Sequence, residues 1–555
     1  MSRSSYVHGS TQVALTNQTI GDYFDQIVQK QANHDALISS AEGLRLNWQQ
    51  LHQATQTLAA GLLALGLTTG DRLAIWAQNS STWLITQLAC AKTGIILVNI
   101  NPSARSSELA QQLNAIEAKA LLFQAKFKSS DYTHMVQTLL PELAQAQAGQ
   151  LQAQAIPSLR HVIQIDDDAP TGMWDLRTVK QLAQRVSAEQ VNTVQRTLHC
   201  HQPCNIQFSS ALGTEAAPVT LSHHNILNNG YFIGQQLQLT PADRICIPVP
   251  LFHCFGMVMG NMAAIAHGAT MVYPDQAFDP EKVLHTIHTE RCTALYGVPA
   301  MFVSLLDHPM LAQSDVSSLR TGIMAGAPCP IEVMQRVTTE LHMPQVVIAY
   351  GMTESSPVSF MSSVHDPLDR RVSTVGQVQP HIEAKILDEN NQIVPLGTVG
   401  QLCVKGYHVM QGYWQRPDLT QQVIREGWLY TGDLARFDED GYCQIVGNIK
   451  DMIIRGGENI YLAEVHAFVR QHPAIAELIL FGVPDPRMGQ ELCAAIRLHE
   501  GHTLDADGLR QYCHGQIAHY KIPRYVLCYD QFPSAGPNQS LKDLLEADAI
   551  QKLGL

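Results

Sequence analysis

The octapeptide YGMTESSP (350–357) carries residue types that suit a phosphate ester and its metal. It follows an apolar run, so we expect it at the end of a strand. The Thr353 hydroxyl and nearby amides could donate hydrogen bonds to phosphate, and the Glu354 carboxylate is a hard oxygen ligand of the kind Mg²⁺ prefers. A helix N-terminus would use the same residues for capping, so both interpretations stay open at this point.

Three other turns have residue types that could hold the rest of a nucleotide. Asp433 in YTGD (430–433) follows a tight turn, where a carboxylate could accept two hydrogen bonds from a ribose diol or serve only the turn. The segment GAP (326–328) offers a backbone that can approach a flat base closely. Gly456 and Gly457 either admit a ligand against the backbone or simply close a hairpin.

The stretch IQFSSALGTEAAPVTLSHHNIL (206–227) has the layout of a phosphate loop without its usual residues. An apolar run leads through a polar loop into the helix-opening SHHN, and such loops bind phosphate through glycine amides and a cation. The segment contains one glycine, Gly213, and neither lysine nor arginine. Glu215 adds a negative charge where phosphate should lie. The local chemistry therefore predicts weak phosphate binding.

The elements that must position these residues alternate between helix and strand. Apolar residues at helical spacing (22–32 and 51–66) alternate with short apolar runs (72–77, 95–100, 269–274, 294–299 and 345–351), which predicts an α/β fold with parallel strands. After about residue 375 the pattern changes to antiparallel hairpins at 381–394, 400–406 and 441–447. A last α/β stretch begins near residue 450.

Length and charge narrow the function classes. A chain of 555 residues is too long for one core and predicts two or more domains. The net charge of -13 argues against nucleic acid or an anionic membrane as the main partner. The N-terminus lacks an apolar signal region. The longest apolar stretch (83–100) is interrupted by Lys92 and Gly94, which predicts a buried helix followed by a buried strand and not a membrane span. We therefore expect a cytoplasmic protein without a transmembrane segment.

The 12 cysteines are scattered and predict reduced thiols. The cluster HCHQPC (199–204) is interpreted as a surface loop. A zinc site is the weaker alternative, because no second ligand pair lies at a suitable spacing.

Eight motifs occur in one order along nearly the whole chain. They are VPLFHCFG (249–256), YGVPAMF (296–302), MAGAPCP (324–330), AYGMTESSPV (349–358), LYTGDLA (429–435), DMIIRGGENIY (451–461), VPDPRMGQELCA (483–494) and HYKIPRYV (519–526). In this order they resemble the adenylate-forming superfamily, and more closely the medium- and long-chain fatty acyl-CoA synthetases. The resemblance implies a large N-terminal AMP-binding domain (1–449) of parallel sheets, helices and a β-rich subdomain. It also implies a small mobile α+β C-terminal lid domain (450–555), with the site between the two.

The resemblance implies a two-step reaction that uses ATP, Mg²⁺ and CoA. A fatty acid carboxylate attacks the ATP α-phosphate to give acyl-adenylate and pyrophosphate, and the CoA thiol then displaces AMP while the lid rotates between steps. The implied catalytic residues are Thr353 at the α-phosphate, Glu354 at Mg²⁺, Lys450 at the hinge and His253 beside the acyl tunnel. The implied cofactor-binding residues are Ala325, Gly326, Ala327, Tyr350, Gly351, Thr353, Asp433, Gly456 and Gly457.

Three family positions that serve adenylation hold other residues here. By resemblance, Ala217 replaces the lysine of the phosphate loop, Asn448 replaces an arginine near the hinge, and Gln539 replaces the adenylation lysine. Loss of one preorganised donor costs roughly 10²–10³ in rate, so two absent lysines could cost on the order of 10⁴–10⁶ if they act independently. We therefore expect adenylation to be lost or severely weakened, whereas the thioester-forming step could survive.

Two other functions stay open. One is a working fatty acid–CoA ligase in which Lys542 or Lys521 compensates for the missing cations. The other is a non-catalytic module that binds acyl groups or nucleotide and regulates a partner. A peptide-synthetase adenylation domain is disfavoured, because LFHCFG (251–256) lacks the acidic residue that anchors an amino acid. The expected ligands are a fatty acid or acyl-adenylate, nucleotide and CoA.

Overall fold

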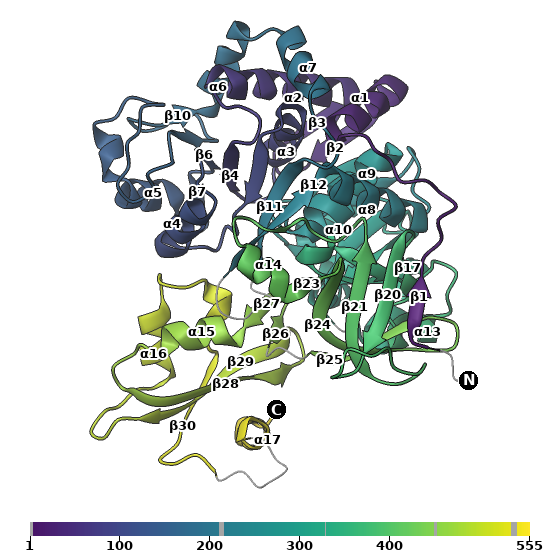
Figure 1. Ribbon diagram of the computed structural model, residues 1–555, viewed down its shortest axis with the longest axis vertical. Coiled ribbons are helices and arrows are strands. Elements are labelled where there is room, and N and C mark those ends of the chain that lie inside the picture. Colours follow the sequence, from purple (N-terminus) through teal and green to yellow (C-terminus); the bar gives the residue numbers. More distant parts are fainter. Residues whose placement is uncertain (1–3, 210–215, 328, 449–451, 534–540) are drawn as a thin grey trace.

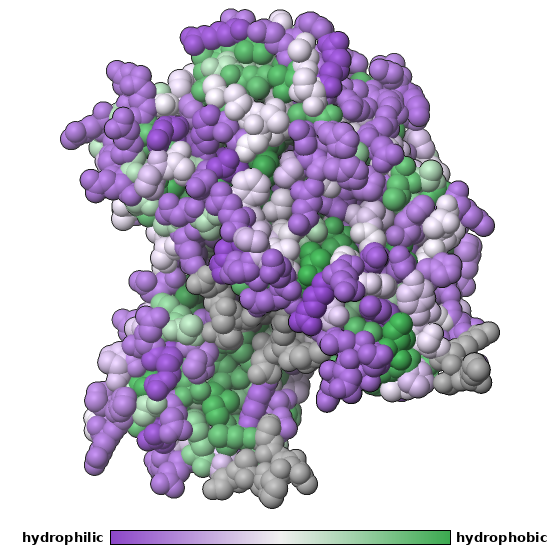
Figure 2. All heavy atoms as spheres, in the orientation of Figure 1, coloured by the Kyte–Doolittle hydropathy of each residue, from purple (hydrophilic) through white to green (hydrophobic). Residues whose placement is uncertain are grey.

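The computed structural model describes residues 4–209, 216–327, 329–448, 452–533 and 541–555. The described residues up to 448 form a large body and those from 452 onward form a small body beside it (Figure 1). Figure 2 shows a largely hydrophilic surface on this face, hollowed at the side where the two bodies meet. The predicted boundary at 449/450 stays a prediction, because residues 449–451 lie outside the described part of the chain.

The first sheet of the large body has a parallel core. Its order is β10 (Trp174–Asp175), β9 (His161–Gln164), β6 (Ala120–Phe123), β4 (Arg72–Trp76), β5 (Ile96–Asn99), β11 (Pro203–Ser209), β12 (Ala217–Ser222) and β22 (Gly412–Tyr413). The strands are parallel from β10 to β11, and β12 and β22 add antiparallel to them. Near-continuous apolar runs such as Leu73–Trp76 form these strands because helices cover both faces of the sheet.

Alternate residues of one strand serve the two faces of this sheet. Leu73 and Ile75 pack in the cluster that contains α1 (Ile20–Gln31), α2 (Trp48–Ala64) and α3 (Ser81–Thr93). Ala74 and Trp76 pack in a second cluster with α4 (Ser106–Ala115) and α5 (Tyr132–Leu139). Helices α6 (Leu176–Leu182) and α7 (Ala188–Arg196) complete the first layer. The apolar stretch at 83–100 is a buried helix followed by a buried strand, as predicted.

The second sheet repeats this layered arrangement. Its order is β19 (Gln377–Val378), β18 (Val358–Met361), β17 (Gln345–Gly351), β16 (Thr321–Ala325), β15 (Ala294–Gly297), β13 (Arg244–Cys246), β14 (Thr270–Tyr273), β2 (Asp35–Ser39) and β3 (Leu44–Asn47). The strands from β17 to β2 are parallel. One face packs on α10 (Pro280–Glu290), α11 (Pro299–Leu306) and α12 (Ile331–Glu340), and α13 (Leu368–Ser373) lies at its margin.

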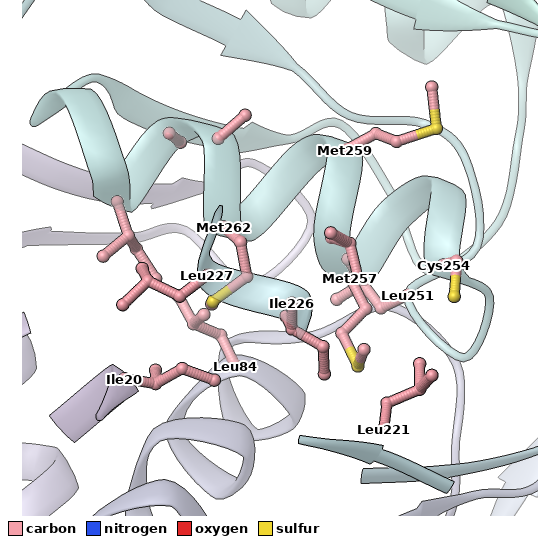
Figure 3. Close-up of a cluster of buried hydrophobic side chains, with 14 of the residues drawn as sticks. Ile20, Leu84, Leu221, Ile226, Leu227, Leu251, Cys254, Met257, Met259 and Met262 are labelled. Atoms are coloured by element: carbon pink, nitrogen blue, oxygen red, sulfur yellow. The ribbon is translucent and has the colours of Figure 1, made fainter. Parts of the chain in front are cut away.

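The other face of the second sheet meets the helices of the first. Here α8 (His223–Gln236), the π-helical segment η3 (Phe255–Met262) and α9 (Ala263–His267) belong to the same buried cluster as α1 to α3. Figure 3 shows Met257 and Met262 of η3 pointing toward Ile226 and Leu227 of α8, with Leu84 of α3 beneath. This shared core joins the two sheets into one body.

A β-rich unit completes the large body. Its order is β1 (Tyr6–His8), β20 (Ile382–Leu387), β21 (Gly400–Gly406), β24 (Trp428–Phe437) and β23 (Ile424–Arg425), with β25 (Cys443–Asn448) paired to β24. All these pairings are antiparallel, and α14 (Pro417–Val423) precedes β23. The change to hairpins after residue 375 is therefore confirmed.

The small body is a sheet between helices. Its strands are β27 (Glu458–Tyr461), β26 (Met452–Arg455), β29 (Gly489–Leu498), β28 (Ile475–Asp485) and β30 (Tyr525–Cys528). One face packs on α15 (Leu462–Val469) and α16 (Ala506–Cys513), and the other packs on α17 (Leu541–Leu553). In Figure 1 α17 lies on the outer side of the small body, away from the large one. The predicted fold class, a large α/β body with a small α+β body, is confirmed.

The cysteine cluster differs from its predicted surface loop. Cys200 and Cys204 are buried at 4% and 6% exposure, and Cys204 belongs to β11. They are buried because β11 enters the sheet directly after the turn, and burial raises the pKa of both thiols. All twelve cysteines are free thiols, as predicted. Within the described residues no group of three metal-ligating side chains gathers, and no helix is long and apolar enough to cross a membrane.

Candidate functional site

Tyr350 and Asp433 come from different sheets and meet at the end of β17. The Tyr350 hydroxyl donates a hydrogen bond to Oδ2 of Asp433 on β24. Burial, reinforced by the Asp433 charge, raises the pKa of Tyr350 well above its ordinary value. The phenol therefore stays protonated, and its hydrogen bond fixes the ring and the carboxylate relative to each other.

Gly351 makes the sharp exit from β17 possible. The register with β18 shifts between Tyr350 and Gly351, and a Cβ at Gly351 would lie 1.7 Å from the Pro357 carbonyl oxygen. Such an approach excludes any side chain, so glycine is required here. The chain then enters the short 3₁₀ turn η5 (Thr353–Ser355). This turn leaves Thr353 partly exposed and buries Glu354.

Glu354 lies where three sheets meet, and it is 1% exposed. The Tyr413 hydroxyl of β22 donates to Glu354 Oε1 at 3.0 Å, and the Met410 amide donates to the Glu354 carbonyl at 2.9 Å. A carboxylate fixed in this way beside the Thr353 hydroxyl is a hard oxygen donor set. These donors fit a Mg²⁺ ion that would be shared with a phosphate.

The loop after β16 comes beside Tyr350 through strand pairing. Ala325 ends β16, is 5% exposed, and pairs with Ala349 on β17. Gly326 is exposed and Ala327 is half-buried directly after it. The structure thus brings Ala325 and Tyr350–Gly351 together at the ends of the neighbouring strands β16 and β17. Thr353 and Glu354 follow in the turn η5, and Asp433 meets Tyr350 from the middle of β24.

A cavity of about 100 Å³ lies between the two bodies. The large body contributes His253, from the turn before η3, together with Thr353. Its remaining lining residues from that body are Asn99, Asn101, Ala104, Glu108, Gln112, Gln207, Phe208, Ser209, Ala216 and Phe252. The small body contributes Glu458, Asn459, Glu464, Ala518, Tyr520 and Lys521. His253 and Thr353 therefore share one cavity, and the small body closes it.

The small body approaches through its Gly456–Gly457 turn. These residues connect β26 and β27 and so close a hairpin, and the approach of a ligand to this turn stays a prediction. A Cβ at Gly457 would lie 2.6 Å from Cγ1 of Val298, which precedes α11 in the large body. A Cβ at Gly326 would also lie 3.3 Å from that methyl group. The turn therefore sits against the same part of the large body as the loop at Gly326, which is predicted to border adenine.

Carboxylates dominate the charge of this cavity. Burial raises the pKa of Glu458, and the nearby charges of His253 and Lys521 offset the effect only in part. Glu108 and Glu464 add two further carboxylates. Within the described lining, Lys521 is the one lysine or arginine, and it is paired with both of them. This charge suits a neutral or cationic group better than a pyrophosphate.

Two of the substituted family positions lie within described backbone. Ala217 begins β12 opposite Ser209, and its side chain is buried at 1% exposure in the core. Asn448 ends β25 directly opposite Asp433. The loop 210–215, the hinge residue Lys450 and Gln539 lie outside the described residues.

Several lining residues were missed by the sequence reasoning. Glu458 stands next to Gly457 in RGGENIY, and a carboxylate directly after a ligand-facing turn was the signal that could have found it. Lys521, in HYKIPRYV, was considered only as a substitute cation. Glu108 and Tyr413 stand in stretches without a distinguishing pattern, so they could not have been found.

Comparisons with known proteins agree with this geometry. Residues 24–414 match the family described as AMP-binding enzyme, and residues 464–537 match the AMP-binding enzyme C-terminal domain. The chain is 41% identical to the medium-chain acyl-CoA ligase ACSF2, mitochondrial, of Bos taurus, over 99% of this chain and 91% of that one. It is 42% identical to the putative acyl-CoA synthetase YngI of Bacillus subtilis, over 98% and 99% of the two chains.

Solved structures share the fold over nearly the full length. The amide bond synthetase McbA of Marinactinospora thermotolerans superimposes with a TM-score of 0.80 at 25% identity, covering 95% of this chain and 99% of that one. A double mutant of o-succinylbenzoate CoA synthetase from Bacillus subtilis, bound with a product analogue, gives 0.77 at 26% identity, covering 96% and 99%.

Proposed function

Because the chain belongs to the family of AMP-binding, adenylate-forming enzymes, we propose that it is an acyl-CoA ligase-type enzyme with an impaired first step. In this proposal ATP-dependent adenylation is lost or severely weakened, and conversion of acyl-adenylate and CoA into acyl-CoA and AMP is retained. The acyl group is of medium chain length, by similarity to the medium-chain acyl-CoA ligases. The predicted cytoplasmic location stays a prediction, since a mitochondrial relative and a bacterial one are equally similar.

The nucleotide half of the site would hold the AMP portion of acyl-adenylate. The Tyr350 ring packs on adenine, the Asp433 carboxylate accepts from the ribose hydroxyls, and the Thr353 hydroxyl donates to the α-phosphate. The loop residues that would border the base are Ala325, Gly326, Ala327 and Gly351. Tyr350 is already hydrogen-bonded to Asp433, so the carboxylate is oriented before nucleotide arrives.

Glu354, with Thr353 beside it, is the residue that would hold Mg²⁺. A bound Mg²⁺ would neutralise phosphate charge in the nucleotide. The chain's own contribution is orientation, because Tyr413 fixes the Glu354 carboxylate and the Met410 amide fixes its backbone.

The charge of the described cavity is the observation that carries the proposed impairment. By resemblance, Ala217 and Asn448 stand at a lysine and an arginine position of the family; Ala217 is buried, and the backbone of Asn448 pairs with that of Asp433. The described cavity adds three glutamates, and its one lysine is paired with two of them. A departing pyrophosphate carries several negative charges, and this site supplies few groups to stabilise them.

The second step needs no such cation cluster. The CoA sulfur forms a bond to the acyl carbonyl carbon, the bond from that carbon to the phosphate oxygen breaks, AMP leaves, and the thiol proton passes to solvent or a base. His253 borders the reacting carbonyl, and the Gly456–Gly457 turn lies along the approach of CoA. The closed position of this turn against Val298 supports a site arranged for thioester transfer.

The proposed lysine substitutes are poorly placed for compensation in this arrangement. The Lys521 ammonium contacts carboxylates of both bodies. Lys542 is the second residue of α17, which covers the outer face of the small-body sheet. These positions favour the impaired ligase over the compensated one.

The deciding experiment measures the two half-reactions separately. Purified protein receives octanoate, ATP and Mg²⁺ while pyrophosphate release is followed. In parallel it receives synthetic octanoyl-adenylate and CoA while thioester formation is followed. We expect clear thioester formation and pyrophosphate release at least roughly 10³-fold slower. Asp433→Asn should weaken the thioester half-reaction and thereby tie it to this site.

Each of the other possible outcomes supports one of the two alternative functions. Pyrophosphate release at the rate of thioester formation, lost in Lys542→Ala, would establish a compensated ligase. Tight binding of octanoyl-adenylate with neither half-reaction would establish the non-catalytic binding module.

A further inference from the structure

Lys521, Glu108 and Glu464 form an ion triad that spans the two bodies. Lys521 Nζ lies 3.0 Å from Oε1 of Glu108 in the large body and 2.6 Å from Oε1 of Glu464 in its own body. We propose that Lys521 is a positioning residue that fastens the small body to α4 and holds the arrangement in which thioester transfer occurs. The identity of that step rests on the proposed function, whereas the fastening itself does not.

The three groups are shielded enough for the interaction to matter. The side chains of Lys521, Glu108 and Glu464 are 12%, 16% and 24% exposed. Exposed ion pairs contribute little because water and salt screen them, and this triad is largely removed from that screening. Burial opposes the charge on Lys521, but the neighbouring Tyr520 oxygen and the two carboxylates outweigh it and raise the pKa of the ammonium.

Glu108 is held in place before the small body docks. It lies in the first turn of α4, and its Oε2 accepts a hydrogen bond from the Arg105 amide at 3.0 Å. This capping leaves Oε1 for Lys521. A preoriented acceptor reduces the entropy that docking must overcome.

Two further contacts lie on the same boundary. The Ser107 hydroxyl of α4 donates to the Gln516 carbonyl at 3.4 Å. The Gly457 turn packs on Val298 at the other side of the cavity. The small body is therefore docked at two places, and in Figure 1 α4 lies on the side of the large body that faces the small one. Of these three contacts, the triad is the one between charged groups.

The triad exists only while the bodies are docked in this way. If the small body rotates, Lys521 keeps Glu464, which moves with it, and loses Glu108, which does not. Loss of Lys521 would leave two shielded carboxylates facing each other and would oppose docking. Nucleotide binding through Tyr350 and Asp433 belongs to the large body, so it should be spared.

The experiment compares Lys521→Met, Glu108→Gln and the double variant with wild type. Thioester formation from octanoyl-adenylate and CoA should fall roughly 10- to 100-fold in Lys521→Met. The double variant should lose less than the product of the two single losses, because each removes the same pair. Lys521→Arg should retain most of the rate. AMP affinity should change less than about twofold in every variant, which also reports correct folding of the large body.

The matched control is Lys552→Met. Lys552 forms an ion pair with Asp548 at 2.7 Å inside α17. The substitution therefore removes an ion pair that does not cross the boundary between the two bodies. Thioester formation should stay at the wild-type rate in this variant.

Cross-linking measures the docking of the small body on α4 without relying on the thioester reaction. Ser107→Cys and Gln516→Cys, in a Cys528→Ser background, place two exposed thiols at the α4 contact for a short bis-maleimide. We expect Lys521→Met to slow the cross-link roughly tenfold and Lys552→Met to leave it unchanged. Unchanged cross-linking in Lys521→Met would overturn the triad's role. Slower cross-linking in a protein whose wild type makes no thioester would support the triad and refute the proposed function.

Discussion

At the scale of single residues, the site depends on carboxylates that are oriented by tyrosine hydroxyls. Tyr350 orients Asp433, and Tyr413 orients Glu354. The partner in each case comes from another sheet, so a substitution at either tyrosine should disturb the carboxylate without removing it. Preorganised groups of this kind lose less entropy on ligand binding.

Asp433→Asn tests the ribose contact. Replacing the carboxylate removes charge-assisted hydrogen bonds, which contribute about 1.5–3 kcal/mol each, so AMP affinity should fall roughly 10- to 100-fold. Isothermal titration with AMP provides the measurement. The control Asp507→Asn changes an exposed acid of the small body and should leave the affinity unaltered. An unchanged Asp433→Asn affinity would remove this residue from the site.

His408 should make stability depend on pH. It is fully buried, its Nε2 lies 3.0 Å from the Ser359 hydroxyl, and burial lowers its pKa from 6.5 to about 3. Below pH 6.5 the unfolded state binds a proton that the folded state excludes, so stability is complete above that pH and falls as the pH drops toward 3. At pH 5 the exclusion of this proton lowers the free energy of unfolding by about 2 kcal/mol.

The measurement is the difference in unfolding free energy between pH 7.5 and pH 5. His408→Gln should reduce that difference by about 2 kcal/mol, whatever its effect at neutral pH. His514→Gln, at an exposed position, should leave the difference unchanged. An identical difference in His408→Gln and wild type would contradict the buried neutral imidazole.

At the scale of elements, the β26–β27 hairpin determines how closely the small body approaches. Gly457 has φ of 89°, and its missing side chain makes room for Val298. The same glycine therefore serves the turn and the boundary. A strand pair with any other turn residue would keep the two bodies farther apart.

Gly457→Ala should separate these two roles when it is compared with Gly501→Ala. Both glycines have positive φ in the small body, and a Cβ at Gly501 would meet no described atom within 4 Å. Turn strain of about 1 kcal/mol is expected in both variants, whereas the clash with Val298 is expected only in Gly457→Ala. Thioester formation should therefore fall at least about tenfold in Gly457→Ala and stay near wild type in Gly501→Ala.

Relief of the clash provides the second readout. Val298→Ala should partly restore the Gly457→Ala rate, because it removes the methyl group that the new side chain would meet. Equal losses in the two glycine variants would refute a boundary role for the hairpin.

At the scale of the whole molecule, the lining of the cavity is divided between two bodies. The large body carries the residues proposed to bind AMP, and the small body closes the cavity with Glu458, Glu464 and Lys521. Charge is divided unevenly as well, since the closing face brings two carboxylates for one ammonium. A ligand with extra phosphates should therefore gain little from closure.

The uneven charge of the cavity predicts the order in which the protein binds AMP, ATP and an acyl-adenylate analogue. ATP should bind no more tightly than AMP, because the described site offers its β- and γ-phosphates no cation besides the paired Lys521. A stable octanoyl-adenylate analogue should bind more tightly than either, since it fills both halves. Thermal shifts at matched concentrations measure the order, with the Asp433→Asn variant as the control for site binding. Stabilisation by ATP well above that by AMP would contradict the proposed impairment.

Much of the fold was predictable from local patterns. The strands at 72–76, 96–99 and 345–351 and the helices α1 to α3 appeared as apolar runs and helical periodicity, because burial of one face or both imposes that spacing. The Gly456–Gly457 hairpin was likewise readable from turn chemistry. The cysteine cluster was misjudged because a polar turn gives no sign that the next strand enters a sheet.

Residue types, motif order and the absence of lysine between residues 206 and 227 were determined by the sequence alone. Only the tertiary structure decided which groups share the cavity. Glu108 and Lys521 are 413 residues apart and meet because the two bodies dock, and Glu458 comes near His253 for the same reason. Glu354 meets Tyr413 because two sheets of the large body pack together. Local propensities act within a few residues, whereas these contacts depend on how whole sheets pack, so no local pattern could contain them.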